Sequence, residues 1–421
     1  MGPVSKTVLA ERLRQCREAL GLTQAQVADH LGIPRTSLVD LEAGQRQVSS
    51  PELSRLAILY GREALDFFDQ EFDPVGVLTA LFRDQLGTEL APSLLETIGR
   101  FLEASRRLSN LESVLMIERA PWESIQTQAL SQPRGLMEAV RQGESMADQA
   151  RRRLGLGVQP LPDLSELLES AGVRTLVAQL PEGVEGVTLC SPDSRPFIVL
   201  AAALGGVRQR FSLAHEYGHV LMDPSRGGMI TRRDNQKELR EIRANAFAGA
   251  FLMPAAGVEE FMAGLGKPRR RNTPVVMEET GFRTVRNTEP GWVSEVQVFD
   301  VLQLAAYFQV SRESALFRLA SLELIKPGDR ENLQRQLSVH GAELGQWMGI
   351  PDERRWPEEA SATRCRLIGL LLEALRREEV SRRWALEVAR LVGISEEDFE
   401  RALDAAGIVN PPADVLLPEG L

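Results

Sequence analysis

The stretch that decides the fold is Phe-Ser-Leu-Ala-His-Glu-Tyr-Gly-His-Val-Leu-Met, residues 211–222, whose centre reads His-Glu-x-x-His. If these residues are helical, His215 and His219 project from one face a single turn apart, so both imidazoles can bind the same zinc ion. Glu216 would then stand beside a water on that metal and could take its proton. The surrounding residues are mostly apolar, which predicts a buried helix.

The alternative interpretation of this stretch is a pair of hydrogen-bonded core histidines, because the five-residue pattern also arises by chance. A second stretch, residues 238–254, favours the metal, because it is strongly helical in composition and ends at Pro254. Its Glu241 lies far enough beyond His219 for a loop and a returning helix, and it is the predicted third ligand, with Glu238 as the alternative. Two histidines and one glutamate form a catalytic rather than a structural zinc set.

The two stretches together resemble the ImmA/IrrE family of bacterial zinc peptidases, whose pattern is an H-E-x-x-H helix, then E-x-x-A-N-x-F-A and a Leu-Met-Pro ending. The resemblance covers residues 145–325 and implies a zincin-like, gluzincin-type endopeptidase with Zn²⁺ as its cofactor. The implied substrate is a bacterial regulatory protein, such as a repressor or antitoxin, cut in response to stress or phage, and cleavage of the chain itself is equally compatible. The implied metal ligands are His215, His219 and Glu241, the implied general base is Glu216, and Asn245, Phe247 and Pro254 match the rest of the pattern.

The N-terminal residues 8–66 read as four or five short helices, with Thr23 as the N-cap of a helix that begins near Gln24. The segment from Gly21 to Arg46 resembles an Xre-type helix-turn-helix, the fold class of phage repressors. The resemblance implies that the helix over 35–43 lies in the major groove of operator DNA. The expected DNA contacts are Arg35, Thr36 and Asp40 at base edges, and Gln24, Ser37 and Arg46 at phosphates or the groove rim.

The alternative for this unit is an Xre-like domain retained for dimerisation without DNA affinity. Residues 1–66 hold eight basic and eight acidic side chains. A neutral monomer binds DNA weakly at physiological salt, so we expect a homodimer on double-stranded DNA.

The composition sets further bounds. The chain has 421 residues and a net charge of −10, which argues against general polyanion binding but leaves room for a local DNA-binding face. Its three cysteines are far apart, so neither a disulfide framework nor a cysteine zinc site is expected. No signal-peptide run and no stretch of about 18 apolar residues is visible, so we expect a cytoplasmic protein without a membrane partner.

The predicted fold class is mainly α with a small β-sheet (α+β). Four units are expected: a helix-turn-helix domain (1–66), a helical linker or dimerisation region (67–144), the peptidase domain (145–325) and a C-terminal helical region that senses a signal or holds a partner (326–421). Linker helices are expected over 67–87, 91–116 and 123–154, and strands over 173–179, 184–189 and 197–202.

Two of the expected segments, 197–202 and 264–294, each allow two interpretations. The strand over 197–202 is a candidate to pair with an extended substrate backbone, or else an ordinary interior strand. Residues 264–294 are rich in proline, glycine and charge, so a solvated loop is expected, with a substrate-guiding flap or a DNA-contacting arm as the alternative.

Two functional hypotheses follow. The first is a DNA-binding transcriptional regulator that carries a zinc-dependent endopeptidase. The alternative is a non-proteolytic transcription factor whose peptidase-like domain is a ligand- or protein-binding sensor, with zinc structural or absent. Glu216 counts against the sensor, because a structural metal site does not need a general base.

Overall fold

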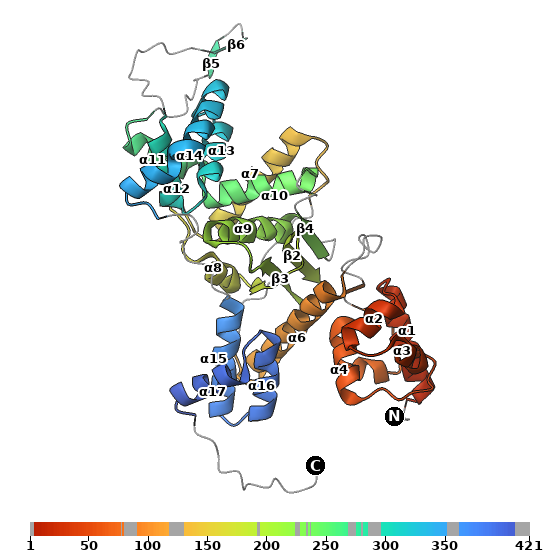
Figure 1. The fold of residues 1–421 in the computed structure, drawn as a ribbon. Coiled ribbons are helices and arrows are strands. Elements are labelled where there is room, and N and C mark those ends of the chain that lie inside the picture. Colours follow the sequence, from red (N-terminus) through yellow and green to blue (C-terminus); the bar gives the residue numbers. More distant parts are fainter. Residues whose placement is uncertain are drawn as a thin grey trace.

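The computed structural model describes residues 4–76, 78–79, 91–117, 130–191, 194–223, 228–232, 235, 237–267, 275–278, 281–284, 296–351 and 362–408 (Figure 1). It combines many helices with a small sheet, which confirms the predicted α+β class. Among the described residues, no single helix is long and apolar enough to cross a membrane; by length and composition only the bent pair Leu239–Leu252 and Ala255–Gly264 passes that test.

The N-terminal unit is a helix-turn-helix domain, as expected. Thr23 and Ser49 each begin a helix with a reciprocal capping box, and Gly32 ends one helix in the left-handed conformation that glycine adopts without strain. A buried ion pair between Arg17 and Glu42, with Nε and Oε1 2.7 Å apart, ties the first helix to the third. The elements are α1 (Lys6–Ala19), α2 (Gln24–Leu31), α3 (Arg35–Glu42), α4 (Ser50–Leu59) and the 3-10 helix η1 (Ala64–Phe68).

The linker helices differ in part from the prediction. Helix α6 (Pro92–Val114) confirms the helix expected over 91–116. The helix expected over 67–87 is wrong at its start, because residues 69–76 are not helical; residues 80–90 lie outside the described part. Of the helix predicted over 123–154, residues 130–135 are not helical, because Pro133 and Gly135 interrupt the helical pattern, and α7 covers Leu136–Arg153; residues 123–129 lie outside the described part.

The sheet has the strand order β1-β3-β2-β4, with β1 and β3 parallel and the other pairs antiparallel. Because β3 is hydrogen-bonded to β1 on one side and to β2 on the other, its backbone has no free edge for a substrate. The hypothesis that 197–202 pairs with substrate is therefore wrong, and the interior-strand alternative holds. The strands are β1 (Arg174–Ala178), β2 (Val184–Ser191), β3 (Ser194–Ala201) and β4 (Gly228–Arg232).

One hydrophobic core lies between one face of the sheet and helices that come both before and after it in the chain. The helices α7 and α10 approach closely at Gly143, where a Cβ atom would lie 2.3 Å from the carbonyl oxygen of Arg243. The helices that contribute to this core include α8 (Leu164–Ser170), α9 (Gly206–Met222), α10 (Leu239–Leu252), α11 (Ala255–Gly264), α12 (Val298–Phe308), α13 (Arg312–Ser321) and α14 (Pro327–Trp347).

A second core lies on the other face of the sheet and continues into the helix-turn-helix domain. It contains Leu176, Val187 and Val199 from the sheet together with α6 and the C-terminal helices α15 (Ala362–Arg376), α16 (Arg382–Leu391) and α17 (Glu396–Ala405). The expected C-terminal region is thus divided between two cores, because α14 packs beside α12 and α13. Inside the expected loop 264–294, β5 (Val275–Glu278) and β6 (Gly281–Thr284) form an antiparallel hairpin.

Helix α6 joins the helix-turn-helix domain to the sheet. At one end it packs against α4, where a Cβ atom on Gly99 would meet the carbonyl oxygen of Ile58. Further along, the buried Arg174 of β1 donates to the carbonyl and hydroxyl oxygens of Ser105 on α6. Arg366 of α15 donates to Glu112 of the same helix at 2.9 Å.

Candidate metal centre and nucleic-acid interface

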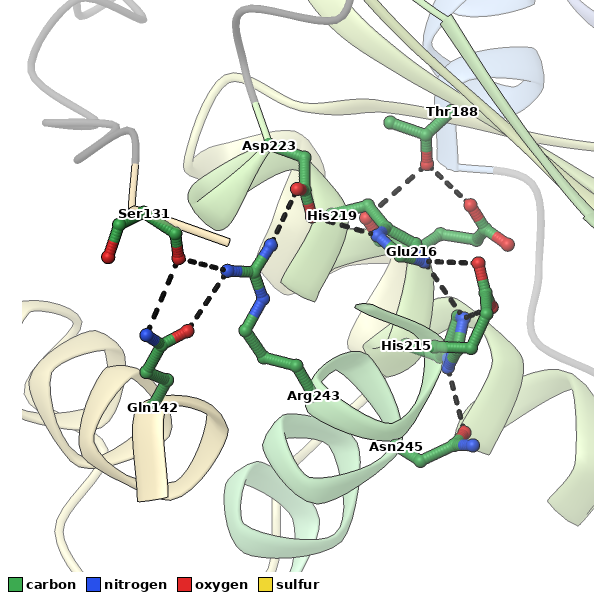
Figure 2. A network of polar contacts seen from close by, with 10 residues as sticks. Ser131, Gln142, Thr188, His215, Glu216, His219, Asp223, Arg243 and Asn245 are labelled. Carbon is green, nitrogen blue, oxygen red and sulfur yellow. Dashed lines mark hydrogen bonds and ion pairs between the residues drawn. The ribbon is translucent and has the colours of Figure 1, made fainter. Parts of the chain in front are cut away.

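Three buried side chains from two helices converge on one point (Figure 2). His215 and His219 of α9 face each other with their Nε2 atoms 3.1 Å apart. Glu241 of α10 reaches both imidazoles, 3.0 Å from His215 Nε2 and 3.5 Å from His219 Nε2. The ligand atoms of the three residues lie within 4.8 Å of one another. Glu238, the alternative ligand, is instead the exposed N-cap residue of α10, outside this cluster.

The hydrogen bonds of the two Nδ1 atoms determine how the imidazole rings are oriented. His215 Nδ1 lies 2.9 Å from Oδ1 of Asn245, and His219 Nδ1 lies 3.1 Å from Oδ2 of Asp223. Both partners are acceptors, so each Nδ1 carries a proton and each Nε2 points toward the other ring and Glu241, where it can bind a metal ion through its lone pair. Two nitrogen lone pairs and a carboxylate at this distance repel one another unless a cation lies between them. This donor set fits a divalent metal ion.

The electrostatics of these side chains lead to the same interpretation. Burial lowers the pKa of His219, but hydrogen bonds to Asp223 and Glu241 outweigh burial and raise this pKa to about 10. Burial raises the pKa of Glu241, but hydrogen bonds to the two imidazoles outweigh it and hold this pKa well below its usual range. The carboxylates therefore favour positive charge beside the imidazoles, and a bound metal ion would supply it.

Glu216 is fixed by one oxygen and free at the other. Its Oε2 accepts a hydrogen bond of 2.6 Å from the hydroxyl of Thr188 on β2, while its Oε1 is buried and has no hydrogen-bond partner. The carboxylate fits there because residue 186 is glycine: a Cβ atom at Gly186 would lie 2.3 Å from Oε1. A carboxylate held in this way can accept a proton from a water placed near the histidines.

A further layer of side chains supports His219 from behind (Figure 2). The buried guanidinium of Arg243 donates to Asp223 Oδ1 at 2.5 Å and to Gln142 Oε1 of α7 at 3.1 Å. Asp223 therefore connects the His219 imidazole to the buried Arg243 guanidinium. Burial raises the pKa of Asp223, but its hydrogen bonds and charge interactions with His219 and Arg243 outweigh burial and lower this pKa. The sequence prediction did not include Thr188, Gly186, Asp223, Arg243 or Gln142. Of these, only Asp223 carries a visible signal, because it follows His219 by one helical turn.

The metal centre opens into a cavity of about 660 Å³. His215, Glu216 and Glu241 line it together with Thr231 of β4, which is an edge strand of the described sheet. The hydroxyl of Thr231 is buried and has no hydrogen-bond partner. The site therefore has room for a ligand. Beside it, the side chain of Asn235 accepts a hydrogen bond from the backbone N–H of Arg232 at 3.0 Å and donates one to the backbone carbonyl of Ile230 at 3.1 Å, so these two groups of β4 are already bonded.

The expected DNA contacts lie on and around α3. Arg35, Thr36 and Asp40 are exposed, and Ser37 is half-buried. The amide of Gln24 donates to Glu42 at 2.9 Å, and Arg46 pairs with Glu52 at 2.5 Å. Three of the six side chains are thus directed to solvent on the second helix of the motif, and their role in DNA binding stays a prediction.

Comparison with known families agrees with both units. Residues 168–320 match the M78 peptidase family, described as an IrrE N-terminal-like domain, and residues 8–66 match a helix-turn-helix domain family. The comparison with curated proteins gave no match. The chain thus joins a helix-turn-helix domain, typical of DNA-binding regulators, to an IrrE-like domain of peptidase type, which confirms the predicted fusion.

Proposed function

We propose that the chain is a DNA-binding transcriptional regulator whose IrrE-like domain is a zinc-dependent endopeptidase. The observation that carries this proposal is Glu216, which is held by Thr188 at one oxygen and unpartnered at the other, beside a His-His-Glu set. A site that only binds a structural ion has no use for a buried, half-free carboxylate, because an unpaired buried acceptor costs stability.

In this proposal His215, His219 and Glu241 hold zinc. Zinc bound there would acidify a water ligand and polarise the carbonyl of the scissile peptide bond. Glu216 Oε1 accepts the proton that the attacking water loses and donates it to the leaving amine as the carbon–nitrogen bond breaks. Thr188 keeps Glu216 oriented through Oε2, and Asn245 and Asp223 keep the imidazoles turned inward.

The proposed substrate is a bacterial regulatory protein, a repressor or an antitoxin, cleaved in a stress or phage-defence response; the chain itself is the other candidate. The resemblance to the ImmA/IrrE family and the helix-turn-helix domain in the same chain support this choice. We propose that α3 reads operator DNA through Arg35, Thr36 and Asp40, with Gln24, Ser37 and Arg46 near phosphates, and that the cytoplasmic protein binds as a homodimer because its N-terminal unit has no net positive charge.

The test separates metal binding from chemistry. Glu216→Gln should keep about one zinc per chain in metal analysis while cleavage of a candidate repressor or antitoxin stops, because amide and carboxylate have the same shape but only the carboxylate accepts a proton. Glu238→Gln, the same change at the exposed N-cap residue that precedes α10, is the control and should cleave normally. Wild-type protein that purifies without zinc and cannot be loaded would favour the sensor alternative, and unaltered cleavage by Glu216→Gln would remove Glu216 from the mechanism.

A further inference from the structure

Two polar atoms beside the metal centre are buried and have no hydrogen-bond partner among the described residues. One is Oε1 of Glu216, and the other is the hydroxyl oxygen of Thr231 on β4. Thr231 is only 7% exposed, and both residues line the cavity of the metal centre. Because a buried hydroxyl without a partner costs stability, its position against this cavity points to a ligand.

The pairing of β2 with β4 places Thr231 next to Glu216. Gly186 of β2 is the register partner of Thr231, and a Cβ atom on Gly186 would lie 2.3 Å from Glu216 Oε1. Side chains of paired residues in an antiparallel sheet lie on the same face, with their Cβ atoms about 5 Å apart. Thr188, which holds the other oxygen of Glu216, lies on this face too, two residues further along β2. The Thr231 hydroxyl and Glu216 Oε1 therefore face the same part of the cavity, close enough for one amide group to contact both.

The backbone on either side of Thr231 is already bonded. The side chain of Asn235 accepts a hydrogen bond from the N–H of Arg232 at 3.0 Å and donates one to the carbonyl of Ile230 at 3.1 Å. In the described part of β4, the Thr231 hydroxyl is therefore the buried side-chain group that is available to a ligand. Its oxygen has two lone pairs, so it can accept a hydrogen bond from an N–H group.

We infer that the Thr231 hydroxyl accepts a hydrogen bond from the N–H of the peptide bond that is cut. The inference rests on the proposed function, in which Glu216 Oε1 returns the proton of the attacking water to the leaving nitrogen. That nitrogen has to come within hydrogen-bond distance of Oε1, and thus beside Thr231. A held N–H fixes the direction of the nitrogen lone pair, which takes the proton as the carbon–nitrogen bond breaks with its electron pair on nitrogen.

The kinetic test compares Thr231→Val, which keeps the branched shape and removes the hydroxyl, with Thr231→Ser, which keeps the hydroxyl. On a fluorogenic peptide that spans a cut site, Thr231→Val should lower kcat/KM by about tenfold, the loss expected for one hydrogen bond to a buried group, while Thr231→Ser should stay within about threefold of the wild type. On the matching depsipeptide, whose scissile ester has no N–H, Thr231→Val should also stay within about threefold of the wild type. An equal loss on the amide and the ester would overturn the inference.

The stability of the same variant tests for a purely structural role. Because the hydroxyl is buried without a partner among the described residues, its removal should leave the midpoint of urea unfolding unchanged or raise it. A lower midpoint in Thr231→Val than in the wild type would assign the hydroxyl to the fold and overturn the inference. This measurement requires neither metal nor substrate.

A binding measurement separates this inference from the proposed function. Acetohydroxamic acid, which binds zinc through two oxygens and presents an N–H between them, is titrated by calorimetry into the zinc-loaded protein, with its N-methyl analogue as the control. Thr231→Val should weaken binding of the parent compound by about three- to tenfold and leave the analogue within about twofold. Equal losses, or no binding of either compound, would overturn the inference. A wild type that cuts no peptide but shows this difference would count against the peptidase and not against Thr231.

Discussion

The position of Glu216 can be tested by adding one methyl group to the strand that faces it. In Gly186→Ala, the new Cβ atom would lie 2.3 Å from Oε1, 2.8 Å from Cδ and 3.0 Å from Cγ of Glu216. Ordinary contacts begin near 3.4 Å, so the carboxylate has to move by about 1 Å and its 2.6 Å hydrogen bond from Thr188 has to stretch or break. A displacement of about 1 Å costs about 100-fold in rate, or about 2.7 kcal/mol of transition-state stabilisation.

The same substitution should leave metal binding and stability almost unchanged. The atoms displaced belong to the end of a flexible side chain, and none of the three metal ligands is touched. The assay is kcat/KM on a cleavable peptide together with the zinc dissociation constant and the midpoint of urea unfolding. Gly205→Ala, at a position with open surroundings before α9, is the control. Wild-type kcat/KM in Gly186→Ala would refute the claim that the placement of Glu216 Oε1 matters for catalysis.

Three further changes probe the rest of the molecule. Asp223→Asn removes the negative charge behind His219 and should weaken zinc binding by about 10- to 100-fold in a chelator competition; an unchanged affinity would mean that Asp223 does not orient the ring. Arg174→Met removes the buried donor to Ser105 and one of the two arginine partners of Glu112, while Arg366 stays paired with Glu112 at 2.9 Å. It should lower the free energy of unfolding by about 1–3 kcal/mol in urea denaturation; a loss below about 1 kcal/mol would show that this joint between β1 and α6 is weak. Arg35→Ala should weaken binding to operator DNA by about 1–3 kcal/mol and relax the preference at one base pair in a binding titration, whereas a uniform loss on all sequences would indicate a phosphate contact.

Local sequence pattern was enough for the parts of the site that lie on one helix. His215, Glu216 and His219 owe their arrangement to the helical repeat alone, and Glu241 follows from the pattern of the second helix. The short helices of the N-terminal unit could also be predicted from local sequence. Thr23 and Gly32, for example, mark the start and the end of α2.

The site residues that the sequence did not predict are placed by contacts between segments that are distant in the chain. Thr188 and Gly186 contact Glu216 because β2 packs against α9. The sequence of a β-strand does not indicate which helix will pack on it. The same holds for the strand over 197–202: alternation and apolar composition identify a strand, but not whether it lies at the edge or the centre of a sheet. Arg243 and Gln142 meet because α7 and α10 pack closely, at a glycine whose role no periodicity shows.

The continuous packing of α6 bears on what self-cleavage could achieve. The helix-turn-helix domain, α6, one face of the sheet and α15–α17 bury their side chains in one core, and Arg174 and Arg366 add polar contacts to α6. A nick between α6 and α7 would cut the backbone and still leave both fragments held together, as an enzyme clipped in a surface loop remains assembled. By the same packing, a cut between α4 and α6 would divide the backbone but leave α2 and α4 against α6. Release of the DNA-binding domain would therefore require these contacts to separate as well as a cut.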